Sequence, residues 1–174
     1  MNISYLPLKE AYAIRREFVN KFVDKSLDFY RYSMGHGDFY GTNSHRHCLW
    51  ESFKSYNVIS KKAALKIISQ IPEVCVTWDH SPSKLSSNLQ KSRIIKIGGE
   101  ALAKALHNTG DFAFRPSDVY VFDADMQFHV TFTHQNISGF GDVCLTSLDN
   151  VEDHGISPAF QELFKTLGMA QFRK

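Results

Sequence analysis

The sequence predicts a single α+β domain over residues 1–174, with a small, mostly antiparallel sheet that contains a β-hairpin and packs against several helices. Three observations lead to this prediction. Helical periods dominate the first seventy residues, a hairpin of alternating residues lies in the second half, and strands do not alternate strictly with helices. The length suits one domain, and no repeat, low-complexity tract or linker divides the chain.

Apolar residues at steps of three and four predict the helices. In the first helix this stripe consists of Ala11, Ile14, Phe18, Phe22 and Val23. Ser60 is placed to cap a later helix that Pro72 ends, and Asn108 with Gly110 ends another. The predicted helices are residues 8–31, a helix that begins near His45, and residues 61–70, 100–107 and 159–167.

Runs of β-branched and aromatic residues predict the strands. The clearest feature is residues 119–134, where two such runs flank a turn at Asp123-Ala124-Asp125. The second run alternates, with Met126, Phe128, Val130 and Phe132 on one side and Gln127, His129, Thr131 and Thr133 on the other. This period of two predicts a sheet with helices on one face and water on the other. The remaining predicted strands are residues 74–78, 93–97 and 144–148.

Composition argues against several classes of protein. The net charge of +2 is small and the basic residues are scattered, so nucleic-acid binding, with Tyr120, Phe122 and Phe128 as stacking residues, is not favoured. No apolar run reaches 18 residues, and the first residues lack the apolar region of a signal peptide. Three widely spaced cysteines are typical of reduced thiols. We therefore expect a cytoplasmic protein that does not bind membranes.

The stretch GHGDFYGTNSHRHCLWESF, residues 35–53, holds the densest set of reactive side chains. Its possible metal ligands are His36, Asp38, His45, His47 and Cys48. Their spacing differs from H-E-x-x-H and from paired C-x-x-C motifs, so we expect no resident metal or cofactor. Cys48 beside two histidines could also be an activated nucleophile. A metal- or His-dependent enzyme that uses this stretch stays open as the alternative.

Two further sites follow from neighbouring motifs. Asp79, His80 and His134 could line one cleft if the strands that carry them are neighbours in the sheet. The segment IGGEALAK, residues 97–104, leads from a strand into a helix, whose N-terminus could hold an anion. It lacks the G-x-G-x-x-G fingerprint and the Walker lysine, so a tight strand-to-helix turn is the favoured interpretation.

Three segments carry a resemblance to a known group of proteins: CLWESF at 48–53, WDHS at 78–81 and DVYVFDADMQFHVTFTHQN at 118–136. Together they resemble small bacterial proteins associated with polymorphic toxin systems, many of which are thought to be immunity proteins. The matching positions are Asp118, Tyr120, Asp123, Thr133 and His134. Gln135 stands where the pattern has an acidic residue, and Phe128-His129 stands where a tryptophan is common.

The resemblance implies a protein that binds one cognate toxin domain and blocks its active site, without catalytic residues of its own. Such a protein needs an exposed patch with aromatic or arginine anchors. Long polar loops that contain aromatic residues often supply such contacts. The predicted contact residues are Phe39, Tyr40, His45 and Arg46 in the loop, with Gln127, His129 and Thr131 on the hairpin face expected to be in water.

Overall fold

The computed structural model describes residues 4–26, 49–79, 94–108, 118–137, 141–149 and 151, of which 8, 78–79, 134–137 and 141–142 are described by backbone alone. These residues form a seven-stranded antiparallel sheet in the order β1-β4-β3-β5-β6-β7-β2. The strands are β1 (Ser4–Tyr5), β2 (Asn57–Ser60), β3 (Val74–Asp79), β4 (Ile95–Ile97), β5 (Asp118–Phe122), β6 (His129–Ile137) and β7 (Gly141–Thr146). Three α-helices pack against the sheet, which confirms the predicted α+β class.

The helices are α1 (Leu8–Phe22), α3 (Lys61–Ser69) and α4 (Gly99–His107), with a short 3-10 helix, η1 (Leu49–Ser52). The predicted cap of α3 is confirmed, because Ser60 Oγ accepts a hydrogen bond from Ala63 N at 3.2 Å. Helix α1 ends nine residues before the predicted boundary at residue 31. Val23 is already extended and pairs with Phe53, so tertiary pairing overrides the helical pattern there.

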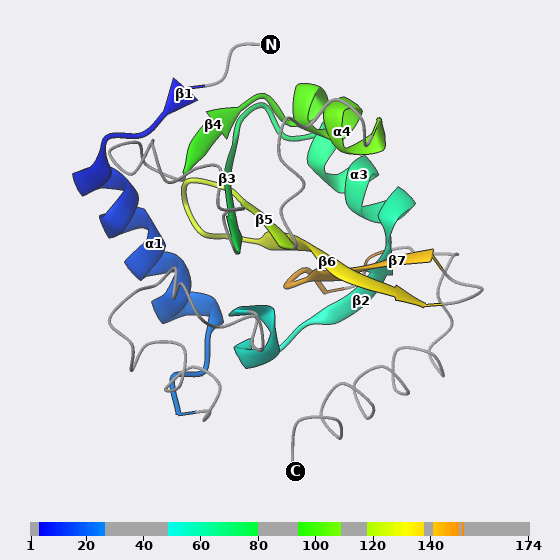
Figure 1. Cartoon of the computed structure of the whole chain (residues 1–174), viewed down its shortest axis with the longest axis horizontal. Coiled ribbons are helices and arrows are strands. Elements are labelled where there is room, and N and C mark those ends of the chain that lie inside the picture. The colour runs from blue at the N-terminus through cyan, green and yellow to red at the C-terminus, as the bar shows by residue number, and fades with distance from the viewer. Residues whose placement is uncertain are drawn as a thin grey trace.

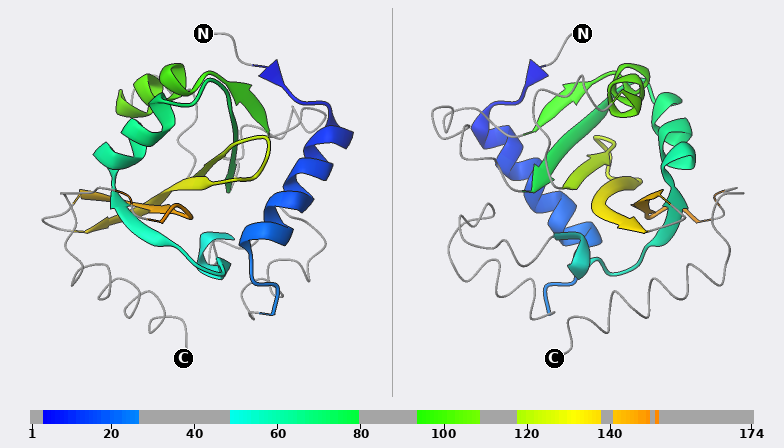
Figure 2. Two further views of the ribbon diagram at one scale, coloured as in Figure 1. Left: turned by 180° about the vertical axis from the view of Figure 1, so that it is seen from behind. Right: turned by 45° about the vertical axis from the view of Figure 1, so that its right-hand side comes forward.

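Helices cover both faces of the sheet, and the strands turn markedly from β4 to β2 (Figures 1 and 2). One core cluster joins α1 and η1 to the sheet, through residues such as Phe18, Trp50 and Tyr120. The other joins α3 and α4 to the opposite face, through residues such as Ile68 and Leu102. The expectation of helices on one face only is therefore wrong.

The prediction that one side of the hairpin faces water is also wrong. His129 and Thr131 of β6 are 0% exposed, and all five residues of β5 are buried. Within β6, Val130 and Phe132 pack in the core beneath α3 and α4, whereas the His129 ring packs against Phe18 and Phe22 of α1 on the opposite face. The period of two was interpreted correctly as two faces, but polar residues do not by themselves place a face in water.

Other elements match to within a few residues. The hairpin is confirmed, although β6 starts at His129 because residues 123–128 form the loop. The predicted helix near His45 is a 3-10 turn over the described part, and the chain is extended again in β2. Strands β1 and β2 had not been predicted.

The predicted helix at residues 159–167 lies outside the described residues. No helix within the described part is long and apolar enough to span a membrane.

Candidate functional site

The sheet face beneath α1 is unusually rich in buried polar side chains. They come from three neighbouring strands, β3, β5 and β6, and alternate with apolar side chains that point to the other face. We call this set the buried polar face: Thr77, Asp118, Tyr120, His129, Thr131 and Thr133. Each is at most 8% exposed. Arg15, on the sheet-facing side of α1, is buried as well at 5%.

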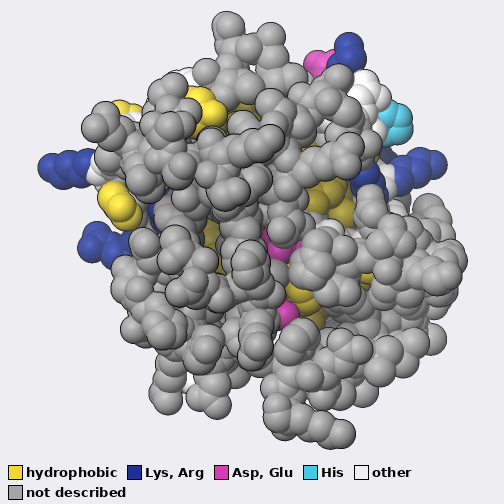
Figure 3. All heavy atoms as spheres, in the orientation of Figure 1, with side chains coloured by type: hydrophobic (Ala, Val, Ile, Leu, Met, Phe, Trp, Pro, Cys, Tyr) yellow, Lys and Arg dark blue, Asp and Glu magenta, His cyan; other side chains and the backbone are white. Residues whose placement is uncertain are grey.

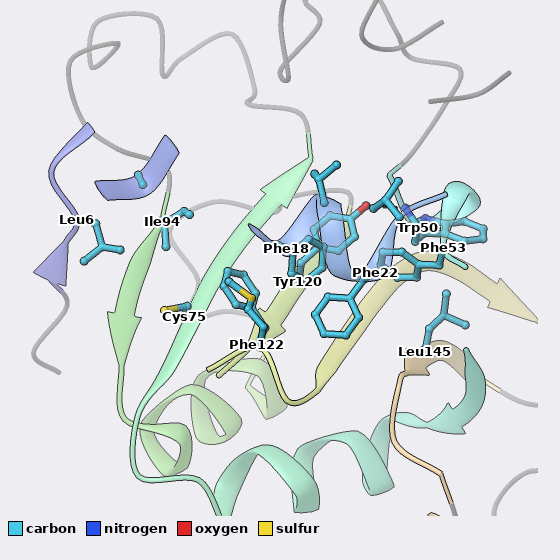
Figure 4. Packing of buried hydrophobic residues seen from close by; sticks show 14 of the residues in the cluster. Leu6, Phe18, Phe22, Trp50, Phe53, Cys75, Ile94, Tyr120, Phe122 and Leu145 are labelled. Carbon is cyan, nitrogen blue, oxygen red and sulfur yellow. Dashed lines mark hydrogen bonds between the residues drawn. The ribbon is translucent and has the colours of Figure 1, made fainter. Parts of the chain in front are cut away.

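Trp50 fastens η1 to the buried polar face. Its indole Nε1 donates to Asp118 Oδ1 at 3.2 Å, and its backbone N donates to the Tyr120 hydroxyl at 3.3 Å. Figure 4 shows the Tyr120 oxygen pointing toward Trp50. Because buried polar atoms are costly when they lack partners, these bonds give Asp118 and Tyr120 a structural role.

His129 lies in an aromatic cage. Its ring centroid is 4.4 Å from that of Phe53, 4.8 Å from Phe22 and 6.0 Å from Phe18. Its Nδ1 lies 3.3 Å from Thr131 Oγ1, and its Nε2 has no hydrogen-bond partner among the described residues. Burial in this cage lowers the pKa of His129 to about 3. The ring is therefore neutral near pH 7 and is shielded from solvent in the closed fold.

Thiols of the sheet are equally unsuited to catalysis. Cys75 and Cys144 are buried in different core clusters, on opposite faces of the sheet. Burial raises the pKa of the Cys75 thiol to about 11, so it stays protonated at neutral pH. Among the described residues, no group of three or more His, Cys, Asp or Glu side chains is placed to hold a metal ion.

The proposed cleft of Asp79, His80 and His134 rests on a strand pairing that the sheet does not have. β5 lies between β3, which ends at Asp79, and β6, which contains His134. Asp79 is instead paired with Asp118. The premise of neighbouring strands is therefore wrong. His80 itself lies outside the described residues.

The C-terminal end of α1 is tied to the chain that follows η1. Asp24 N donates to Ser52 O at 2.7 Å, Lys54 N donates to Phe22 O at 2.9 Å, and Val23 pairs with Phe53. We call residues 22–24 with 52–54 the α1–η1 junction. Lys54 also caps α1, because its Nζ donates to Asn20 O at 2.7 Å and to Lys21 O at 2.9 Å. The junction brings together the two described ends that flank residues 27–48.

A stripe of exposed residues runs along α1 toward this junction. At successive steps of three, four and four it contains Lys9, Tyr12, Arg16 and Asn20, which we call the α1 stripe. Tyr12 is 62% exposed, the most exposed large hydrophobic residue of the described part. Asn20 Oδ1 accepts a hydrogen bond from Lys25 Nζ. On the left of Figure 3, over α1, a hydrophobic side chain lies between basic ones.

The α1 stripe carries no acidic side chain. The exposed acidic residues of α1 are Glu10 and Glu17. Because successive helix residues are rotated by about 100°, both lie toward the opposite edge of the solvent-facing side from the stripe. Glu10 is also close to Lys96, with an Nζ–Oε1 distance of 3.9 Å. The stripe therefore presents a tyrosine between two cations. Sequence reasoning missed it, although its signal, an aromatic residue among basic ones on the polar side of a predicted helix, was visible.

The predicted contact residues fall into three groups. Phe39, Tyr40, His45 and Arg46 lie outside the described residues, as do the possible metal ligands His36, Asp38, His47 and Cys48. Gln127 is exposed, as expected. His129 and Thr131 are buried, so neither can contact a partner on the folded surface. The stacking candidates Tyr120, Phe122 and Phe128 are buried too.

The glycines of IGGEALAK form a tight turn, as favoured from the sequence. Gly99 N, at the start of α4, donates to Ile71 O at 3.2 Å. A Cβ on Gly99 would lie 2.2 Å from Ile68 O and 2.3 Å from Ile71 O. The N-terminus of α4 is therefore packed against the end of α3. This close packing explains why a glycine stands at position 99, and no phosphate-binding role is needed to explain it.

Comparisons of the chain with protein-family models, with curated proteins and with solved structures gave no match.

Proposed function

We propose that the chain is a cytoplasmic, non-catalytic binding protein of the immunity type, which neutralises a bacterial toxin domain by covering its active site. One observation carries the proposal furthest. The α1 stripe runs to the α1–η1 junction, and the junction holds both described ends that flank residues 27–48. The described residues on either side of the segment that carries the predicted contact residues Phe39, Tyr40, His45 and Arg46 are thus joined at the C-terminal end of the helix that bears the α1 stripe.

The chemistry of the α1 stripe suits protein recognition. Tyrosine and arginine are enriched among the residues that contribute most to binding at protein interfaces, since they combine a large contact area with hydrogen bonding. With Lys9 and Arg16 on either side of Tyr12, the complementary surface is acidic with an apolar recess. A toxin domain bound at the stripe would be blocked sterically by this chain, so no group of this chain needs to react.

The roles of the ionisable side chains in the sheet support recognition over catalysis. Asp118 accepts the Trp50 indole, His129 is held neutral in an aromatic cage, and Cys75 is held as a thiol. Each of these groups contributes to packing or to internal hydrogen bonding. A metal- or His-dependent enzyme built on residues 35–53 is the alternative against which the proposal is tested.

The test is capture of partners by the untagged full chain from lysate of its native host, with identification by mass spectrometry. We expect one stoichiometric partner that arrests growth when expressed alone and is harmless when this chain is expressed beside it. Stoichiometric zinc in the purified chain, with no such partner, would contradict the proposal and favour the enzyme.

A further inference from the structure

His129 connects the buried polar face to the α1–η1 junction. Its ring packs against the rings of Phe22 and Phe53. The backbones of the same two residues form the junction, because Phe22 O accepts from Lys54 N and Phe53 pairs with Val23. A displacement of the imidazole therefore acts first on the residues that hold the junction closed.

We propose that His129 is an acid-sensitive latch, whose protonation opens the α1–η1 junction and admits water to the ring while the sheet stays paired. This inference does not depend on the proposed function, because the latch lies within this chain and needs no partner.

The cage is built for a neutral ring. A protonated imidazole has an N–H at both nitrogens, and each needs an acceptor. Nδ1 has Thr131 Oγ1 within reach, whereas Nε2 has no partner among the described residues. Attraction between the imidazolium and the Phe22 and Phe53 rings would offset only part of the cost of burying the charge. Burial therefore penalises the charged form, in agreement with a pKa of about 3.

Few charged groups surround the ring. Helix α1 contributes Phe18 and Phe22 to the cage, and Phe53 follows η1. The buried titratable groups on the packed elements are Arg15 of α1 and Asp118 with Tyr120 of β5. Toward solvent the ring's neighbours carry Asp24 and Lys54 at the junction, Glu51 of η1, and Lys21, whose Nζ lies 5.8 Å from the Phe22 ring centroid. Among the described residues, no carboxylate hydrogen-bonds to either ring nitrogen. No counter-ion of the described part therefore stabilises the imidazolium in place.

Opening the junction is the shortest way to hydrate the ring. Phe22 and Phe53 keep 8% and 6% of their surface exposed, whereas Tyr120 and Phe122 of β5 have none. The junction is held by two backbone hydrogen bonds, which together form the isolated Val23–Phe53 bridge, and by the two hydrogen bonds from Lys54 Nζ to α1, while β5 pairs along its length with both β3 and β6. Local opening is expected where contacts are fewest, so the junction opens before the sheet does.

The test is amide hydrogen exchange of the full chain between pH 7.5 and pH 5.0, corrected for intrinsic exchange rates. The Asp24 and Lys54 amides report opening of the junction. If opening exposes His129 to water, where its pKa is ordinary, their opening constant rises about 30-fold over this range. Hydrogen bonds from Ser26 hold the pKa of Asp24 below its usual range, so Asp24 stays charged throughout.

His129→Leu and His129→Gln remove the titration, and the rise at Asp24 and Lys54 should disappear in both. Amides of β5 should exchange far more slowly than those of the junction at every pH. Junction opening that is independent of pH in the wild type, or a rise that persists in the variants, would overturn the latch. If neither variant folds, the titration of the His129 ring in the wild type is followed by NMR instead. Titration of His129 with an ordinary pKa while the junction stays closed would also overturn the latch.

Discussion

At the scale of single residues, the loop between β5 and β6 shows how one carboxylate extends a β-turn by accepting further backbone hydrogen bonds. Met126 N donates to Asp123 O at 3.1 Å, and Met126 takes a left-handed φ of 55° while its side chain stays buried. Asp123 Oδ1 accepts from Gln127 N at 2.7 Å and from Phe128 N at 3.1 Å. This double acceptance sets where β6 begins.

Replacing Asp123 with alanine should therefore lower the free energy of unfolding by about 1–3 kcal/mol, because two backbone N–H groups lose their acceptor. Urea denaturation measures the change. Asp125→Ala is the matched control, since it removes an exposed carboxylate two residues away and should be nearly neutral. Equal losses in the two variants would show that the Asp123 hydrogen bonds do not stabilise the loop.

At the scale of elements, the sequence predicted the types of α1, α3, α4 and the β5–β6 hairpin correctly, and it missed features that depend on distant partners. Ser60 signalled the start of α3 locally, through its own hydrogen bond to Ala63 N. The end of α1 had no such local signal, because Val23 is extended by pairing with Phe53, thirty residues away. The buried polar face was mistaken for a wet one because its cover, α1 and η1, lies far from β5 and β6 in sequence.

The same contrast applies to the candidate site. The spacing of Lys9, Tyr12 and Arg16 on the polar side of a predicted helix was visible in the sequence. The junction at the end of that helix was not, since its hydrogen bonds join residues 22–24 to residues 52–54. Position within the fold, rather than residue type, separates the exposed Tyr12 from the buried His129.

The contact between α3 and α4 provides a test at this scale. Gly99→Ala should destabilise the protein by roughly 1–3 kcal/mol, as overpacking typically does, because its Cβ would overlap backbone oxygens of Ile68 and Ile71. Thermal unfolding measures the loss. Gly98→Ala is the neighbouring control, since a Cβ there meets Pro72 O at an ordinary 3.5 Å. A tolerated Gly99→Ala would mean that the helices separate without cost.

At the scale of the whole molecule, two helical layers enclose a sheet whose central strand is buried on both faces (Figure 1). One layer, α3 with α4, packs on apolar side chains. The other, α1 with η1, packs on a face that includes a carboxylate, an imidazole and several hydroxyl groups. Acid should therefore affect the second layer more than the first.

The free energy of unfolding of the whole protein should decrease as the pH is lowered, because of His129. Its pKa is about 3 when folded and near 6.5 when unfolded, so the unfolded state binds the proton first as pH falls. The stability that the neutral ring contributes is complete above pH 6.5 and is lost progressively toward pH 3. Between pH 7.5 and pH 5.0 this amounts to about 2 kcal/mol.

Urea denaturation at both pH values measures this difference, with His129→Leu as the control. The variant should lack the part of the pH-dependent stability change that His129 causes, while the part caused by other titratable groups remains. An identical pH dependence in the wild type and the variant would place the responsible group elsewhere.

The central claim is that the surface of α1 recognises a toxin domain, and the most direct measurement is the affinity of the full chain for the captured partner by calorimetry. Tyr12→Ala combined with Arg16→Ala should weaken binding by at least 100-fold, about 2.7 kcal/mol, if these residues are anchors. Tyr40→Ala with Arg46→Ala tests the adjoining segment in the same way. Glu17→Ala with Lys21→Ala, on the other edge of α1, should bind as the wild type does. Undiminished affinity in the Tyr12 and Arg16 variant would contradict the account.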